Sequence, residues 1–160
     1  MWDGLALSEC RGTLLPENRQ RGTQTMATTH LMTDAEAEAI PEVKAVFDDI
    51  RATRGSDFIN NIWRALAADP AGLKRTWESV KSLMAVPGAL DPKTREMIYI
   101  AVSVANGCGY CVHSHTAAAK AKGMSDAEHG ELMQIVALAA STNHLVTALQ
   151  VPIDPEFDVT

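Results

Sequence analysis

The sequence predicts an all-α fold, a bundle of about six helices, from three observations. Apolar residues recur at three-residue and four-residue spacing from Thr33 onward, as on one face of a helix. Capping boxes and Asp-Pro pairs mark helix starts at several places. Alternating runs typical of strands are nearly absent, and the inferred connections are short, roughly two to five residues, as in helical bundles.

The first four helices follow from these start signals. Thr33 and Glu36 form a capping box, in which each side chain satisfies a backbone N–H of the other residue. The second helix begins at Pro41 and ends at Arg54-Gly55-Ser56. The fourth begins at Asp69-Pro70, where the aspartate is the expected cap, and ends at Pro87-Gly88. The apolar stripes of helices two, three and four are expected to be Val43, Val46, Phe47 and Ile50; Phe58, Ile59, Ile62, Trp63 and Leu66; and Leu73, Trp77, Val80, Leu83 and Met84.

Three further helices are expected after residue 90. Asp91-Pro92 opens one that runs to Asn106-Gly107, and another begins near Cys108 and ends at Gly123, a residue suited to a left-handed cap. A capping box of Ser125 and Glu128 opens the final helix, which runs to about Gln150. Its apolar residues cover more than one face, so we expect a homo-oligomer. These residues are Leu132, Ile135, Val136, Leu138, Ala139, Leu145, Val146 and Leu149.

Composition limits the class of protein. We expect residues 1–30, which have no helical or strand period, to be a flexible tail, and residues 31–160 to form a single domain. Met26 resembles a natural start, which leaves open whether residues 1–25 are native. The formal net charge of -6 argues against a nucleic-acid partner, and no apolar run is long enough for a membrane span. Three cysteines with one C-x-x-C indicate a reducing compartment, so we expect a cytoplasmic protein.

The helix from Pro92 to Asn106 contains the most apolar segment of the chain. Between Met97 and Ala105 only Ser103 is polar, so this helix is expected to be buried on all sides. Glu96 shares a stripe with Ile100, Ser103 and Gly107. Burial there would raise the pKa of its carboxyl group unless a charged or hydrogen-bonding group meets it. The alternative is that Glu96 faces water beside Lys93 and Arg95.

The following helix places two thiols and an imidazole on one stripe. At about 100° per residue, Cys111 and His115 lie within about 60° of Cys108, whereas His113 points to the far side. Residues at i and i+3 are roughly 5–6 Å apart, which a disulfide can span. A helix N-terminus and a nearby imidazole both favour the thiolate, so we interpret Cys108, Cys111 and His115 as a site for thiol redox chemistry.

Two alternatives remain open for these residues. One is a zinc site in which Cys108, Cys111 and His115 are joined by His113, Glu96 or a distant histidine, although no second ligand pair is present. The other is a pair of buried cysteines in an alanine-rich helix contact, which leaves His115 unexplained. We assign no catalytic role to three further histidines or to the third cysteine. We expect two tryptophans and three methionines to fill the core. These residues are His113, His129, His144, Cys10, Trp63, Trp77, Met84, Met97 and Met133.

The spacing of these residues resembles a known family. The pattern is Glu96, eleven residues, Cys108-Gly-Tyr-Cys111, three residues and His115, followed further on by Gly123-Met-Ser. It is similar to that of the AhpD-like alkylhydroperoxidases of the carboxymuconolactone decarboxylase superfamily, in the group often labelled peroxidase-related. The resemblance runs from about Pro41 to Pro155 and is most specific from Arg95 to Gly123. It implies an all-helical fold assembled as dimers, trimers or hexamers. The implied activity is reduction of organic hydroperoxides or hydrogen peroxide by the dithiol, with electrons returned by a dithiol donor such as a lipoyl protein.

The resemblance also implies a role for each site residue. Cys111 is expected to be the cysteine oxidised to sulfenic acid, Cys108 the partner that donates a proton and closes the disulfide, and Glu96 with His115 the proton relay. We expect no cofactor and no bound metal. Tyr110 departs from members that have histidine directly before the second cysteine. The alternatives are a non-enzymatic dithiol redox adaptor, a zinc-binding helical module, or a decarboxylase-type lyase, against which the C-x-x-C argues because true decarboxylases generally lack it.

Overall fold

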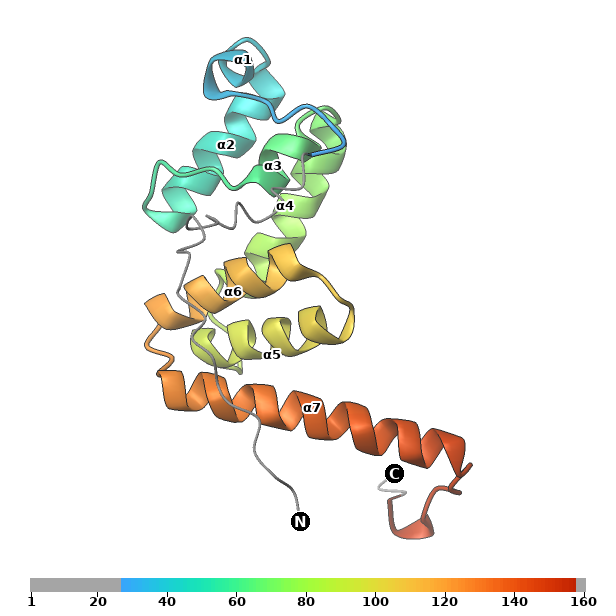
Figure 1. Cartoon of the computed structure of the whole chain (residues 1–160). Helices are drawn as coiled ribbons and strands as arrows, with labels where there is room; N and C mark the ends of the chain where they lie inside the picture. Colours follow the sequence, from blue (N-terminus) through green and yellow to red (C-terminus); the bar gives the residue numbers. More distant parts are fainter. Residues whose placement is uncertain (1–26, 158–160) are drawn as a thin grey trace, which may run out of the picture.

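The computed structural model describes residues 27–157, and every regular element in that range is helical (Figure 1). The α-helices are α1 (Asp34–Glu38), α2 (Pro41–Arg54), α3 (Asn61–Leu66), α4 (Pro70–Met84), α5 (Pro92–Ala105), α6 (Gly109–Ala121) and α7 (Asp126–Ala148), followed by the 3-10 turn η1 (Pro155–Phe157). The all-α prediction is confirmed, and the described range has seven α-helices, one for each of the seven segments located from the sequence, against the stated count of about six. The predicted tail, residues 1–30, lies mostly outside the described residues.

Most of the predicted helix boundaries are confirmed. Thr33 and Ser125 both form complete capping boxes, and the Asp91 side chain accepts a hydrogen bond from the Thr94 N–H. The prediction for Asp69 is wrong in part, because Pro70 does open α4 but the Asp69 side chain makes no capping hydrogen bond. Gly123 follows α6 with φ +87°, a conformation that a side chain would strain. Local sequence signals were therefore a reliable guide to where the helices begin and end.

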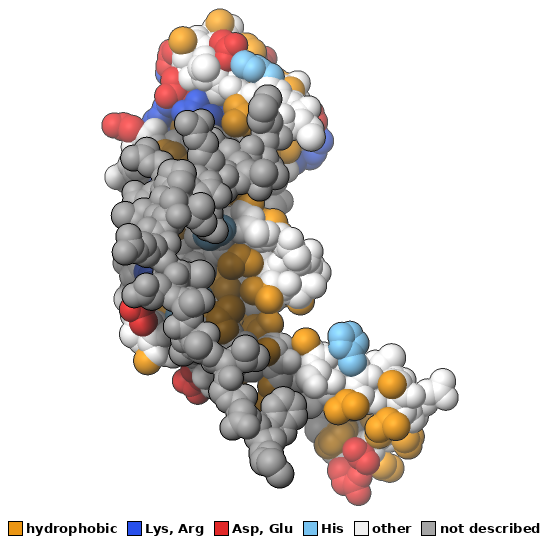
Figure 2. Space-filling view, in the orientation of Figure 1, with side chains coloured by type: hydrophobic (Ala, Val, Ile, Leu, Met, Phe, Trp, Pro, Cys, Tyr) orange, Lys and Arg blue, Asp and Glu red, His pale blue; other side chains and the backbone are white. Residues whose placement is uncertain are grey.

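The helices pack around two apolar clusters. The first lies among α1, α2, α3 and α4, and it contains the predicted stripe of α2 together with Trp63 and Trp77, whose rings meet edge to face with centroids 5.4 Å apart. The second lies among α5, α6 and α7 and contains Ile100, Ala119, Met124 and Leu132. Met97 and Met133 pack against this second cluster, as predicted for core methionines. Two separate cores leave much apolar surface between and beyond them, some of which Figure 2 shows.

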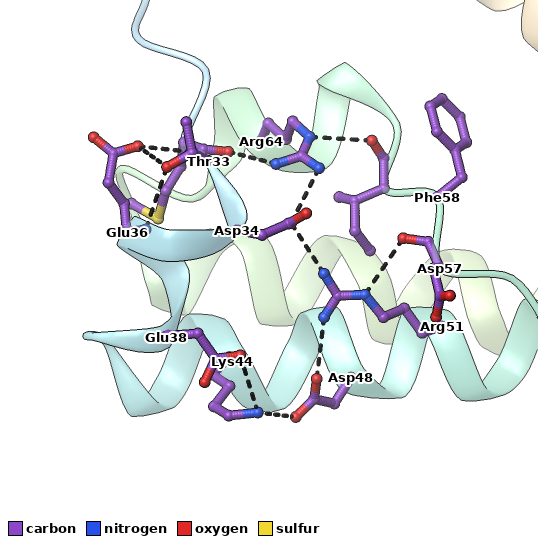
Figure 3. Close-up of polar contacts among 12 residues, drawn as sticks. Thr33, Asp34, Glu36, Glu38, Lys44, Asp48, Arg51, Asp57, Phe58 and Arg64 are labelled. Carbon is purple, nitrogen blue, oxygen red and sulfur yellow. Dashed lines mark hydrogen bonds and ion pairs between the residues drawn. The ribbon is translucent and has the colours of Figure 1, made fainter.

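Ion pairs tie the start of the described chain to the first cluster (Figure 3). One carboxylate oxygen of Asp34 lies 2.9 Å from the Arg51 guanidinium and 3.0 Å from that of Arg64. Arg64 also donates to the Met32 carbonyl at 2.8 Å. Because Asp34 is half exposed, each pair contributes little to stability, but together they fix α1 against α2 and α3.

Replacing Leu73 with alanine is expected to lower the free energy of unfolding by about 3 kcal/mol, because the deletion leaves a cavity in the first cluster, where Leu73 is fully buried. Urea unfolding followed by circular dichroism measures this loss. Phe58→Ala is the control, since Phe58 is 65% exposed and its truncation is expected to change stability by less than about 0.5 kcal/mol. Equal effects of the two substitutions would contradict this assignment of the core.

Several apolar residues that were predicted to be buried are exposed. Helix α3 begins only at Asn61, and two residues of the stripe predicted for it, Phe58 and Ile62, are exposed. Leu83, near the end of α4, is exposed too. Helix α5 is not buried on all sides: Glu96, Ile100 and Ser103 form its one buried stripe. The residues Ile98, Tyr99, Val102 and Val104 face outward. The prediction for α5 was wrong because no other described element of the same chain covers its second face.

Helix α7 extends well beyond the helices that it contacts (Figure 1). Its first half packs on α5 through Leu132, Met133 and Val136. We name residues 137–157 the α7 arm; every one of them is exposed. Figure 2 shows apolar side chains on the arm and in the hollow between the arm and the rest of the molecule. Among the described residues, no helix is long and apolar enough to cross a membrane.

Candidate active site

The candidate site lies where α5 meets α6. The two helices are joined by a tight turn in which Gly107 has φ +68°, and the Cys108 N–H donates to the Ser103 carbonyl at 2.9 Å. A glycine at this position permits the left-handed backbone that reverses the chain. The turn brings the N-terminus of α6, with its cysteines, beside the last turns of α5.

Cys108 and Cys111 form a disulfide, with their Cα atoms 5.3 Å apart. Cys108 is the N-cap of α6, and its Sγ accepts a hydrogen bond from the Cys111 N–H at 3.3 Å. The prediction that i, i+3 spacing allows this bond is confirmed. Because unpaired N–H groups and the positive end of the helix dipole surround the cap position, the site favours negative charge on sulfur once the pair is reduced.

Glu96 of α5 and His115 of α6 also meet across the contact of these two helices, with His115 one helical turn after Cys111. Glu96 is 5% exposed, so the buried alternative holds and the solvent-facing one is wrong. One carboxylate oxygen lies 2.5 Å from Nδ1 of His115, and the other accepts a hydrogen bond from Nζ of Lys122 at 2.9 Å. A buried carboxylate with a partner on each oxygen is held in one orientation.

These contacts determine the protonation of Glu96. Burial by itself raises the pKa of the carboxyl group, but the hydrogen bonds from His115 and Lys122 and the charge of Lys122 outweigh it, so that the pKa of Glu96 lies below its ordinary value of 4.5. Glu96 is therefore a buried anion at neutral pH, able to fix the tautomer and orientation of the His115 ring. Sequence reasoning named both residues of this pair.

Lys122 was missed by the sequence analysis. It follows His115 by seven residues, which is two helical turns, so the two side chains lie on the same face of α6. The signal was present in the sequence, but a lysine near the end of a helix is usually read as a favourable partner of the helix dipole. Its contact with Glu96 across 26 residues depends on how α5 and α6 pack.

Two tyrosines flank the site. The Tyr99 ring stacks on His115, with centroids 3.7 Å apart and planes 19° apart. Tyr99 comes three residues after Glu96, about 60° around α5, so it lies at the edge of the buried stripe. The Tyr110 hydroxyl accepts a hydrogen bond from the Ile62 N–H at 3.3 Å, which connects α6 to α3. Tyr110 thus makes a contact to the backbone of α3.

A cavity of about 630 Å³ opens beside the disulfide. Its lining is mostly apolar and comes from the end of α4, the segment between α4 and α5, helix α5, and Cys108 and Cys111. Arg95 lines it too, but its guanidinium donates to the carbonyls of Leu83, Val86 and Leu90 and so holds the wall of the cavity in place. Tyr99 lines the cavity and also stacks on His115, so it connects the cavity to the Glu96–His115 pair.

The structure thus assembles the four predicted residues from two neighbouring helices, as two bonded pairs. Among the contacts of residues 27–157 there is no hydrogen bond from His115 to either sulfur, as expected when both sulfurs are in a disulfide and have no proton to exchange. His113 and His144 are exposed and His129 is half-buried. Within the same range, no group of three or more His, Cys, Asp or Glu side chains is placed to hold a metal ion.

Fold and site together define an all-helical protein with a disulfide-forming C-x-x-C pair next to a buried Glu–His pair. The chain belongs to the carboxymuconolactone decarboxylase family, which it matches over residues 70–154, and within it to the AhpD-like proteins. The crystal structure of the alkylhydroperoxidase AhpD core from Rhodospirillum rubrum is 68% identical, with a TM-score of 0.82, over 84% of this chain and 99% of that one.

A second similar protein is more distant. Alkyl hydroperoxide reductase AhpD of Azorhizobium caulinodans is 31% identical over 110 residues, which are 66% of this chain. The match spans 60% of the length of that relative. The two comparisons agree with the resemblance inferred from Glu96, Cys108, Cys111 and His115.

Proposed function

We propose that this protein is a thiol-dependent peroxidase that reduces organic hydroperoxides through Cys108 and Cys111. The observation that best supports this function is the C-x-x-C disulfide at an apolar cavity, beside a buried Glu96–His115 pair. The names of both similar proteins point to the same chemistry. The test is steady-state consumption of cumene hydroperoxide with dihydrolipoamide as the electron donor, against the same mixture without protein.

The proposed cycle has three steps. The Cys111 thiolate attacks the outer oxygen of the hydroperoxide, the O–O bond breaks, and the alcohol leaves with a proton while Cys111 becomes a sulfenic acid. The Cys108 thiol then attacks that sulfur, which forms the disulfide and releases water. A dithiol donor reduces the disulfide by thiol–disulfide exchange and becomes a disulfide itself. Each turnover therefore oxidises one donor dithiol and reduces one hydroperoxide to an alcohol and water.

In this cycle Glu96 and His115 move the protons. The ionised Glu96 accepts the N–H at Nδ1 of His115, which leaves the other ring nitrogen free to take the proton of a reduced thiol. The imidazolium that forms is stabilised by the same carboxylate. Lys122 is a positioning residue in this scheme, because it acts only through Glu96.

The cavity favours a neutral, apolar substrate. Its lining is mostly apolar, and the charge of Arg95 is already engaged with three backbone carbonyls. A volume of about 630 Å³ is within the range of small-molecule sites. The donor is proposed to be a small or protein-borne dithiol such as a lipoyl group. A cytoplasmic location remains a prediction from the cysteine content.

Replacing Lys122 with methionine is expected to reduce peroxide turnover about tenfold and to move the acidic limb of its pH profile to higher pH. Lys122 lowers the pKa of Glu96, so without it burial raises that pKa and protonates the carboxylate at a higher pH. The pairing of ionised Glu96 stabilises the wild-type fold above pH 4.5, and this stability is lost as pH falls through the lowered pKa.

The measurement for Lys122 is the pH dependence of kcat/KM with cumene hydroperoxide. Lys122→Arg is the matched control and should keep the wild-type acidic limb, because it retains a cation near Glu96. A uniform loss of activity in Lys122→Met, with no change in the profile, would show that Lys122 has only a structural role.

A further inference from the structure

The α7 arm presents an unusual surface. Seven of its large apolar side chains are each about half or more exposed: Leu138, Leu145, Val146, Leu149, Val151, Ile153 and Phe157. No Asp, Glu, Lys or Arg occurs between residues 132 and 153. Single exposed apolar residues are ordinary on protein surfaces, but an uncharged stretch of this length is typical of a surface that another molecule covers.

The helical conformation of the arm also requires a partner. Helical segments of about 12 residues are marginal in water, and most of their stability in proteins comes from packing an apolar face. Residues 137–148 continue α7 in the direction away from α5 (Figure 1), so the arm of a continuous helix cannot fold back onto its own chain. Its partner must be another surface.

A complementary surface lies on the same chain, around the cysteine cavity. Five exposed apolar side chains surround that cavity, and we name them the cavity rim: Leu83, Val86, Leu90, Ile98 and Val102. The sequence has no charged residue from 83 to 90, nor from 97 to 119. Both surfaces are thus apolar and uncharged, and both are present on every copy of the chain, as a symmetric self-association requires.

We propose that the α7 arm of a second copy of this chain packs on the cavity rim and closes the cavity over Cys108 and Cys111. The exposed apolar side chains of the arm provide surface on the order of the roughly 800 Å² per partner that a standard stable interface buries. Each site is then completed by its neighbour, and the outer wall of the substrate cavity comes from the partner's arm. The proposed closure is argued only from the apolar surfaces of the α7 arm and the cavity rim. Its role in enclosing a hydroperoxide rests on the proposed function.

The first test is the mass of the full chain in solution. Light scattering at micromolar concentration is expected to give an oligomer for the wild type and a monomer for the double variant Leu145→Asp, Leu149→Asp. Phe58→Asp is the matched control, because Phe58 is also exposed but lies between α2 and α3, and this variant should remain oligomeric. A monomeric wild type overturns the proposal. That result is also the one expected if residues 1–26 of the same chain, and not a second copy, cover the arm.

The second test asks whether the arm reaches the rim of another copy. Two chains are mixed, and in both of them Cys10, Cys108 and Cys111 are replaced by serine. One chain has a new cysteine on the arm, by Leu138→Cys, Leu145→Cys or Leu149→Cys. The other has a new cysteine on the rim, by Val102→Cys. Mild oxidation of the mixture is expected to join the two chains for at least one arm position, about tenfold more than for a Phe58→Cys chain used as control. An oligomer with no arm-to-rim link at any of the three positions overturns the proposal.

The third test measures closure without relying on peroxidase activity. Reduced Cys108 and Cys111 of the arm variant are expected to react about tenfold faster with a bulky maleimide than those of the wild type, because the cavity opens. Unchanged reactivity in a variant that is monomeric overturns closure over the cavity. A wild type that passes all three tests but consumes no hydroperoxide refutes the proposed function and leaves the closure established.

Discussion

Replacing Cys111 with serine is expected to reduce hydroperoxide turnover by at least about a thousandfold, since Cys111 is the proposed point of attack and a serine hydroxyl cannot be oxidised to a sulfenic acid. Replacing Cys108 with serine also stops turnover, but it leaves the first step intact, so that one equivalent of hydroperoxide is consumed. The sulfenic acid on Cys111 then persists, because the partner thiol that would form the disulfide is absent. Dimedone labelling followed by mass spectrometry detects the modified cysteine.

This prediction tests which of the two sulfurs attacks the hydroperoxide. Cys108 is the N-cap of α6 and already accepts the Cys111 N–H, which favours a thiolate on Cys108. His115, four residues after Cys111, favours Cys111 instead. We follow the histidine and assign the first attack to Cys111. Rapid peroxide consumption by Cys111→Ser, or a label on neither cysteine in Cys108→Ser, would contradict this assignment.

The match between sequence and structure is closest where the determinants are local. Capping boxes at Thr33 and Ser125, the i, i+3 spacing of the cysteines and the stripe that contains Glu96 depend on neighbours within two helical turns, and each was predicted from the sequence. Such features follow from backbone geometry, which is the same in every helix. The elements that hold the site together could therefore be identified before the fold was known.

The features that could not be predicted depend on distant contacts. Lys122 reaches Glu96 only because α6 packs on α5, and the cavity has a wall only because Arg95 holds three carbonyls between residues 83 and 90. The exposed faces of α5 and of the α7 arm are a different case. Their apolar sequences indicated burial, and yet they are exposed among the residues that the structure describes. A pattern of hydrophobic residues predicts that a face is covered, but it does not say by which chain.

Replacing Glu96 with glutamine is expected to reduce hydroperoxide turnover by about a hundredfold or more, the scale of a lost general acid–base group. The glutamine keeps the size of the side chain but not its charge, so it no longer stabilises a protonated His115 or pairs with Lys122. Reduction of the Cys108–Cys111 disulfide by dihydrolipoamide should largely survive, because in that reaction the attacking thiolate belongs to the donor. The two rates, measured on the same preparation, separate the relay from the disulfide chemistry.

The matched control for Glu96 is Glu128→Gln. Glu128 also pairs with a lysine, at 2.7 Å from Lys93, but it lies in the capping box of α7, away from the cysteines, so turnover should be unchanged. Circular dichroism checks that both variants stay folded. If Glu96→Gln consumes hydroperoxide at the wild-type rate, the carboxylate is not part of a relay, and the non-enzymatic redox adaptor becomes the better account of the C-x-x-C pair. If both reactions fall equally, Glu96 only supports the packing of α5 on α6, and the catalytic role proposed for it is wrong.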